Sequence, residues 1–489
     1  MITRSQTRAK ALVWMRLPAE IRLMVLEAIA SQKNPGWASL ASVCREWQHV
    51  LERANFHKIK LGISCLDGFE RVATIQKREI IRHVCLNVTI PPTYFSKKRS
   101  QSVRIGSMVS RGIWKLFSIL STWTPTNDLA LEINVHSPSD CKYWFKNIYV
   151  CSDNTEHYED ATPETWRTGP RYHDPKHGWI HGQQVRRPPR AAIQRLFRPI
   201  PLWFPMRLPQ VKAVNCLIIR RQLRRSILPS GLDELVRSLD RLENISYEPW
   251  APYDSNCRYY FGRGNLPDTV KRLTIFRDAY KFYDSFPRRP TSAAAWSGWP
   301  SWLYHCELLW VNFASQSLKL QHLAISYMVN AEDIFQRCQP TWTWSQLESL
   351  ALTSELLQDN WEKRSQLEAL LCRAGILAQQ MPKLHRFVLW NGGKGHACAF
   401  IYCVGRDNAS ITWRGTWQLE LRPLVVERWQ LVASKLPYYK YGGLQIKQEN
   451  IQGVIHSHGD AIHHLELPCQ VVDPASLWQI RREGYTLTQ

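Results

Sequence analysis

Three stretches of the sequence, VNCLII (214–219), LENISY (242–247) and VKRLTI (270–275), place apolar side chains at their first, fourth and sixth positions. They begin at 214, 242 and 270, so the starts are 28 residues apart twice in succession. In a strand, the fourth and sixth positions share one face. A regular period of this length is typical of repeats that combine one strand and one helix. The pattern therefore predicts short parallel strands stacked side by side.

The same pattern recurs along the chain. It is found at Ile81/Val84/Leu86, Leu320/Leu323/Ile325, Leu347/Leu350/Leu352, Leu384/Phe387/Leu389 and Ile462/Leu465/Leu467. Several occurrences follow an amphipathic stretch that predicts a helix, for example GLDELVRSLDR (231–241) and QLEALLCRAGILAQQM (366–381). Neither a strand nor a helix of such a unit buries its apolar side alone, so the units must stack.

We therefore predict an α/β fold class, an irregular leucine-rich-repeat-like solenoid with parallel strands and helices. The array is degenerate because the later spacings are longer and the asparagine expected after the motif is missing. Residues 61–150 hold the first helix–strand units, and residues 206–489 form the main repeat region. The polar, proline-rich residues 151–205 and the stretch 284–302 are predicted insertions. We expect residues 151–205 to add little to the core and to be cut first by proteases.

The composition limits the class of protein. The chain has 489 residues, 44% of them hydrophobic, and 22 tryptophans, which favours a folded protein with an aromatic-rich core or recognition surface. No apolar run is long enough to span a membrane, and no secretory signal follows the charged residues 1–14, which we read as a basic arm. Thirteen cysteines without a C-x-x-C pair are typical of reduced thiols, so we expect a cytoplasmic or nuclear protein without membrane contact.

Lys and Arg exceed Asp and Glu, 63 to 41, for a formal charge of +22. Such a balance fits nucleic acid, acidic lipid or an acidic protein partner. The charge is spread over short clusters, and no zinc module or RNA-binding motif accompanies them.

The N-terminal sequence has a different pattern of apolar residues from the repeats. LPAEIRLMVLEAIA (17–30) and WASLASVCREW (37–47) predict two short amphipathic helices, and VLERANFHKIKL (50–61) predicts a third. Three such helices bury their own apolar faces poorly, so they need a partner surface.

The opening Leu17-Pro18, the pair Val25-Leu26 and the ending Val43-Cys44-Arg45 to Trp47 resemble the F-box, a three-helix module. The resemblance covers about residues 15–60. It implies an N-terminal three-helix F-box module that docks onto the Skp-family adaptor of cullin-RING ubiquitin ligases. Arg22 departs from the family, which more often has an apolar residue there. With degenerate repeats behind it, the chain resembles fungal F-box proteins.

This resemblance implies a set of adaptor-binding residues: Leu17, Pro18, Ile21, Val25, Leu26, Trp37, Leu40, Val43, Cys44 and Trp47. The alternation of the strands adds a second set, because side chains between the apolar positions point away from the core. This predicted substrate face consists of Arg220, Glu248, Arg272, Phe276, His322, Ser326, Arg386, Trp390 and Glu466. We expect it to form one open surface.

Motifs for chemistry are weak. His173, His177 and His181 are four residues apart, but Pro175 and Gly178 argue against a helix that would align them as metal ligands. HSHGD (456–460) brings a base and an acid together without a nucleophile, and NGGKGH (391–396) lacks phosphate-loop spacing and predicts a turn. We expect no metal, no cofactor and no catalysis by this chain.

The sequence thus predicts the non-catalytic substrate-recognition subunit of an SCF-type ligase. Its partners would be the Skp-family adaptor, a cullin through that adaptor, and an unidentified protein substrate. A basic repeat scaffold that binds nucleic acid without a ligase role is the alternative, and an enzyme with an unrecognised site is a further one.

Overall fold

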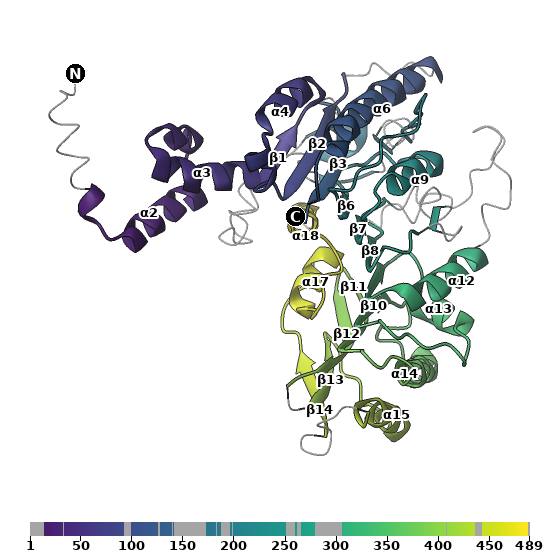
Figure 1. Ribbon diagram of the computed structural model, residues 1–489. Helices are drawn as coiled ribbons and strands as arrows, with labels where there is room; N and C mark the ends of the chain where they lie inside the picture. Colours follow the sequence, from purple (N-terminus) through teal and green to yellow (C-terminus); the bar gives the residue numbers. More distant parts are fainter. Residues whose placement is uncertain are drawn as a thin grey trace.

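The computed structural model describes residues 14–32, 34–91, 99–125, 128–138, 140, 173–181, 183–186, 196–197, 199–250, 260–261, 266–278, 306–406, 408–435 and 443–487. Its main feature is one sheet whose 12 strands lie side by side in chain order (Figure 1). These strands are β1 (Lys58–Leu61), β2 (His83–Thr89), β3 (Ala130–His136), β6 (Cys216–Ile219), β7 (Asn244–Tyr247), β8 (Arg272–Phe276), β9 (His322–Ser326), β10 (Ser349–Thr353), β11 (Arg386–Gly393), β12 (His396–Val404), β13 (Ala409–Gly415) and β14 (Leu444–Asn450).

The sheet is mostly parallel. Each strand from β1 to β10 runs parallel to the next strand of the sheet. The pairs β11–β12 and β12–β13 are antiparallel, and β14 is parallel to β13. Within the sequence NGGKGH, Lys394 and Gly395 form the turn between β11 and β12, and Gly395 has φ +82°. A separate small hairpin pairs β4 (Trp179–Ile180) with β5 (Gln183–Gln184). The predicted α/β class with parallel strands is confirmed, and so is the predicted turn.

Helices occupy the connections between strands. The α-helices are α2 (Ala19–Gln32), α3 (Arg45–His57), α4 (Leu66–Val72), α5 (Ile75–Arg78), α6 (Arg99–Ser121), α9 (Pro229–Arg237), α12 (Cys306–Gln316), α13 (Ala331–Arg337), α14 (Arg364–Ala378), α15 (Pro423–Ala433), α17 (His458–Leu465) and α18 (Pro474–Leu487). The short 3-10 turns are η1 (Trp37–Ser42), η2 (Ile63–Cys65), η5 (Pro175–His177), η9 (Ser317–Lys319) and η10 (Trp361–Lys363). None of the described helices is long and apolar enough to cross a membrane.

The helices α6, α9 and α12 to α15 cover one side of the sheet, which we call the outer face. Seven of the eight apolar triplets predicted from the sequence lie on this face, and their side chains join one buried cluster. α14 shows why the sequence folds this way: Leu367, Leu370, Leu371, Ala374, Leu377 and Ala378 follow a helical period and are all buried.

Aromatic packing fills the outer face at its C-terminal end. The ring of Trp429 on α15 lies 5.0 Å from Phe387, 5.1 Å from Phe400 and 5.0 Å from Tyr402, measured between ring centroids. The Trp429 indole N–H donates to the carbonyl of Leu371, 3.1 Å away, so its polar atom is satisfied. Here the tryptophan content contributes to the core rather than to an exposed surface.

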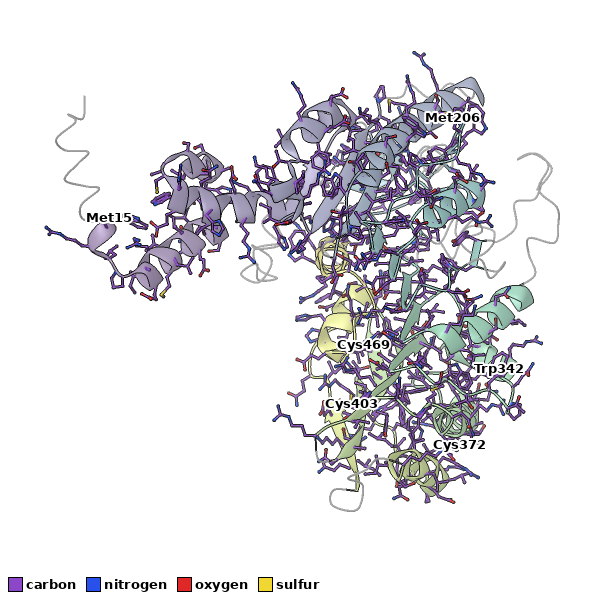
Figure 2. All side chains as sticks on the ribbon, in the orientation of Figure 1. Met15, Met206, Trp342, Cys372, Cys403 and Cys469 are labelled. Atoms are coloured by element: carbon purple, nitrogen blue, oxygen red, sulfur yellow. The ribbon has the colours of Figure 1, made fainter. Side chains whose placement is uncertain are left out.

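The opposite side of the sheet, which we call the inner face, is covered by α17 and α18 (Figure 1). The eighth apolar triplet was predicted as a strand, and this is wrong, because Ile462 and Leu465 belong to α17. The Ser457 side chain caps this helix by accepting from the backbone N–H of Asp460, 3.1 Å away. Apolar residues three positions apart fit a helix as well as a strand. Figure 2 shows Cys403 and Cys469 on the inner side, and Trp342 and Cys372 among the outer helices.

The N-terminal helices form a unit of their own, residues 14–57, which extends away from the sheet (Figure 1). Only the end of α3 reaches the sheet, where Phe56 packs against the outer-face cluster. The Lys77 ammonium of α5 lies 4.5 Å from the Phe56 ring centroid, and 3.9 Å from the Glu52 carboxylate. We call residues 14–57 the N-terminal unit.

The predicted insertion at 151–205 is described only in part, and residues 151–172 and 284–302 lie outside the described residues. Its C-terminal end contributes to the core, contrary to the prediction: Leu196, Phe197, Ile200 and Leu202 are buried. The sheet is continuous across the insertion, because β3 pairs directly with β6.

Candidate functional sites

The N-terminal unit is held together by a small interior. Leu26 of α2 and Leu51 of α3 are fully buried, and the rings of Trp14 and Trp47 lie 5.4 Å apart. The Glu46 carboxylate accepts from Arg22 Nε at 2.8 Å and from the Trp14 indole at 3.1 Å. These two donors lower the pKa of Glu46. Arg22, which interrupts the apolar stripe of the sequence, thus joins α2 to α3 through its hydrogen bond to Glu46.

Apolar side chains nevertheless remain on the surface of this unit. The exposed large ones are Met15, Leu17, Ile21, Leu23, Met24, Val25 and Val43, and we call the last six the N-terminal apolar face. Ile21 is 42% exposed and Val43 is 58% exposed. Exposed apolar side chains gathered on one small unit are typical of a surface that another molecule covers.

The residues predicted to contact an adaptor divide into three groups. Leu17, Pro18, Ile21, Val25, Val43 and Cys44 are exposed, and Trp37, Leu40 and Trp47 are half-buried. Leu26 is buried and holds the unit together, so it is not available to a partner. Leu23 and Met24 are exposed although they were not among the predicted contacts. A helical wheel of residues 19–32 places Met24 beside Ile21, three positions earlier, and Leu23 on the other side of the helix.

The predicted substrate face lies on the inner face of the sheet, in two rows. Arg272, His322, Ser349 and Arg386 are the first residues of β8 to β11 and are direct neighbours in the strand register. We call them the edge row; Ser349 was not predicted. Four residues further along three of these strands lie Phe276, Ser326 and Trp390.

The edge row is partly open, since Arg272 and Arg386 are exposed and His322 is half-buried. By contrast, Phe276, Ser326 and Trp390 are each 0% exposed, so the prediction that they form an open surface is wrong. Trp390 packs edge-on against Tyr327, with ring centroids 5.2 Å apart, and belongs to the cluster that includes Ile462 and Leu465 of α17. The strand register was predicted correctly, but the C-terminal helices cover these side chains.

Arg220 and Glu248 are buried as well, in a cluster of charges under α18. The Arg220 guanidinium lies 3.4 Å from Glu132 and 3.1 Å from Asp473. Arg221 next to it is ion-paired with Asp278 and donates to both carboxylate oxygens of Glu483 on α18, at 2.9 and 2.8 Å. We call these seven residues the ion junction: Glu132, Arg220, Arg221, Glu248, Asp278, Asp473 and Glu483.

Glu248 accepts three hydrogen bonds in this junction. The donors are the backbone N–H groups of Arg221 at 3.0 Å and Asp473 at 2.7 Å, and the Ser476 hydroxyl at 2.5 Å. Burial, followed by the nearby charge of Asp473, raises the pKa of Glu248 to about 7. Burial also works against ionisation of Asp278, but Arg221 and His458 outweigh it and lower the pKa of Asp278 to about 2.

The excess of carboxylates explains this difference. The ion junction holds five carboxylates and only two guanidiniums, so at least one carboxylate must be stabilised by other donors or take up a proton. Glu248 is such a group, because it accepts from two backbone N–H groups and a hydroxyl. The junction fastens α18 to the sheet through charge and hydrogen bonds, in addition to the apolar contacts that Leu477 and Ile480 of this helix make in the inner-face cluster.

Glu466 does not lie on a strand at all. It follows the last residue of α17 with φ 43°, and its carboxylate pairs with Arg414 of β13 at 3.2 Å. The linker 466–473 therefore starts beside β13 and ends at Asp473, which contacts Glu248 next to β7. Leu467, Cys469, Val471 and Val472 of this linker pack against the inner face.

Groups that could support catalysis occur on the inner face as well. His83 Nε2 lies 2.8 Å from Glu132, an arrangement that can orient a base. Cys216 lies two strands away in the register, and burial, with Asp473 and Asp128, raises the pKa of its thiol to about 11. A thiol with so high a pKa is a poor nucleophile at neutral pH.

The histidine clusters do not form a metal site in the part of the chain that is described, where no three His, Cys, Asp or Glu side chains are arranged to hold a metal ion. The rings of His173 and His181 lie 4.9 Å apart across the turn η5. His458 contacts Asp278 at 3.2 Å and His464 lies 3.6 Å from Asp460, so both pair with carboxylates.

Comparison with known proteins gives one family. Residues 265–473 match a family of unknown function, DUF6546. The matched region begins before β8 and ends at Asp473, so it includes the edge row and α17 but not the N-terminal unit. No curated protein matches the chain.

Proposed function

We propose that this protein is a non-catalytic substrate-recognition subunit of an SCF-type cullin-RING ubiquitin ligase. In this proposal the N-terminal unit is an F-box that binds the Skp-family adaptor, and the rest of the chain is an irregular leucine-rich-repeat-like solenoid that holds a protein target. The chain would act in the cytoplasm or nucleus and would promote ubiquitin transfer by proximity.

The N-terminal apolar face carries this proposal. The residues through which an F-box resemblance implies adaptor contact include Leu17, Ile21, Val25 and Val43, and all four are exposed. The unit that holds them extends from the sheet, where a partner can reach it (Figure 1). An apolar face in this position favours association, because burying it removes apolar surface from water.

Two charges placed on this face test the proposal. Ile21→Asp combined with Val43→Asp should weaken adaptor binding at least tenfold, which is about 1.4 kcal/mol. The milder pair Leu17→Ala and Pro18→Ala should act in the same direction. Binding is measured by titrating purified adaptor against the full chain.

Ile75→Asp is the matched control, because Ile75 is 76% exposed on α5, outside the N-terminal unit. It adds a charge to an exposed apolar position and should leave adaptor binding unchanged. Full adaptor affinity in a folded Ile21/Val43 double variant would contradict the proposal.

A further inference from the structure

The edge row differs from the rest of the inner face in the state of its arginines. Arg220, Arg221 and Arg414 each pair with two carboxylates. Among the described residues, neither Arg272 nor Arg386 lies within ion-pair distance of a carboxylate. Arg272 has one long hydrogen bond, 3.5 Å to the Asn244 side chain. Two exposed guanidiniums on one edge thus keep their full charge available to a ligand.

Their spacing is set by the sheet. Arg272 lies on β8 and Arg386 on β11, and the register makes His322 and Ser349 the residues between them. Neighbouring strands are about 4.8 Å apart, so the two arginine positions are separated by about 14 Å. An extended peptide advances about 3.3 Å per residue, so groups four residues apart match this distance.

The middle of the edge row has a different charge. Glu348 precedes Ser349, and its carboxylate lies 3.7 Å from His322 Nε2. Burial and the charges of Arg272 and Arg386 lower the pKa of His322, while Glu348 raises it. A ligand that crosses the row therefore meets positive charge at both ends and a carboxylate near its centre.

The C-terminal segment leaves this edge accessible. The linker 466–473 crosses the inner face beside the row. Burial raises the pKa of its Cys469 thiol to about 11, although a hydrogen bond with Ser349 and the charge of Arg386 lower it. The linker covers Ser349, which is buried, but not the side chains of Arg272 and Arg386.

We propose that the edge row binds an extended acidic segment of a protein, with two anionic groups about four residues apart and no acidic residue between them. One group would pair with Arg272 and the other with Arg386, and Glu348 would reject a central acid. This inference deepens the proposed function by naming the class of target. A nucleic-acid backbone fits less well, because its evenly spaced phosphates would place charge against Glu348.

The probes are fluorescent peptides with two aspartates separated by three neutral residues, measured by anisotropy with the full chain. Arg272→Gln combined with Arg386→Gln should weaken binding at least tenfold and remove the preference over a peptide with two asparagines. A peptide with a central aspartate should bind the wild-type chain more weakly than the parent peptide does. The Glu348→Gln variant should recover affinity for this peptide. A phosphoserine version shows whether phosphate or carboxylate is the preferred anion.

Arg104→Gln combined with Arg111→Gln is the matched control, because both arginines are exposed on α6 and the net charge changes equally. Equal peptide affinity in the wild type and the Arg272/Arg386 variant, with an unchanged melting temperature, would overturn the proposal. Tighter binding of random single-stranded RNA than of the peptide, lost in the same variant, would overturn it in favour of nucleic acid.

The two proposals fail separately. The Arg272/Arg386 variant should keep full adaptor affinity, and the Ile21/Val43 variant should keep full peptide affinity. Peptide binding by a chain that binds no adaptor would refute the proposed ligase role and leave the edge row as an acidic-segment site.

Discussion

The two faces of the sheet are closed by different physical means. Leucine, isoleucine, valine and aromatic side chains from successive helices seal the outer face, in one continuous apolar cluster. On the inner face, α17 docks through apolar contacts with strands β11 and β12, whereas α18 combines apolar contacts of Leu477 and Ile480 with the ion junction. Glu483 and Arg221, which join α18 to the sheet, are 262 residues apart in the chain.

This contrast shows how differently the two faces tolerate change. Apolar burial is non-directional, so a substitution on the outer face loses contacts roughly in proportion to the buried area. A buried charge needs its particular partner, and removing one member leaves the other uncompensated. The inner face therefore depends on a few individual residues.

The largest expected effect tests that dependence. Arg221→Met should lower the free energy of unfolding by about 4 kcal/mol, because Asp278 and Glu483 would stay buried without their guanidinium. Urea denaturation followed by tryptophan fluorescence measures it. Arg414→Met is the control, since its half-exposed ion pairs should contribute less than about 1 kcal/mol. Similar losses in the two variants would show that the ion junction is not special.

A somewhat smaller effect is expected where the inner face is apolar. Trp390→Ala should cost about 3 kcal/mol, because it opens a cavity between the sheet and α17. Arg386→Ala on the same strand should change stability by no more than about 0.5 kcal/mol, since its side chain is exposed. Thermal and urea unfolding of the two single variants measure the loss of stability in each. A harmless Trp390→Ala would mean that α17 does not cover β11.

The smallest effect concerns pH. Glu248 has an ordinary pKa of 4.5 and a folded-state pKa of about 7, so the folded protein holds this proton more tightly. The resulting stabilisation is complete below pH 4.5 and is lost as the pH rises to about 7. Asp278 has a lowered pKa and affects stability only below about pH 4.

Glu248→Gln should therefore flatten the stability profile between pH 4.5 and 7, whatever its effect on absolute stability. Urea midpoints at several pH values measure the slope. An equal slope in the wild type and the variant would show that Glu248 does not titrate in this range.

The sequence by itself determined the outer face of the sheet. Triplets such as Val214/Leu217/Ile219 predict their own burial, because strand alternation and helix periodicity are local properties. The stretch 17–47 predicts amphipathic helices for the same reason. The strand register of the edge row also followed from the triplets, since each row lies a fixed number of positions from the buried side chains.

Only the tertiary structure decided which inner-face residues stay open. Nothing near Trp390 or Glu248 in the sequence indicates that α17 and α18 return to cover them, since the segment that does so lies at the far end of the chain. The ambiguous spacing of Ile462 and Leu465 predicted a strand where a helix forms. Long-range ion pairs such as Arg221 with Glu483 have no local pattern, because they depend on geometry that exists only after the sheet has formed.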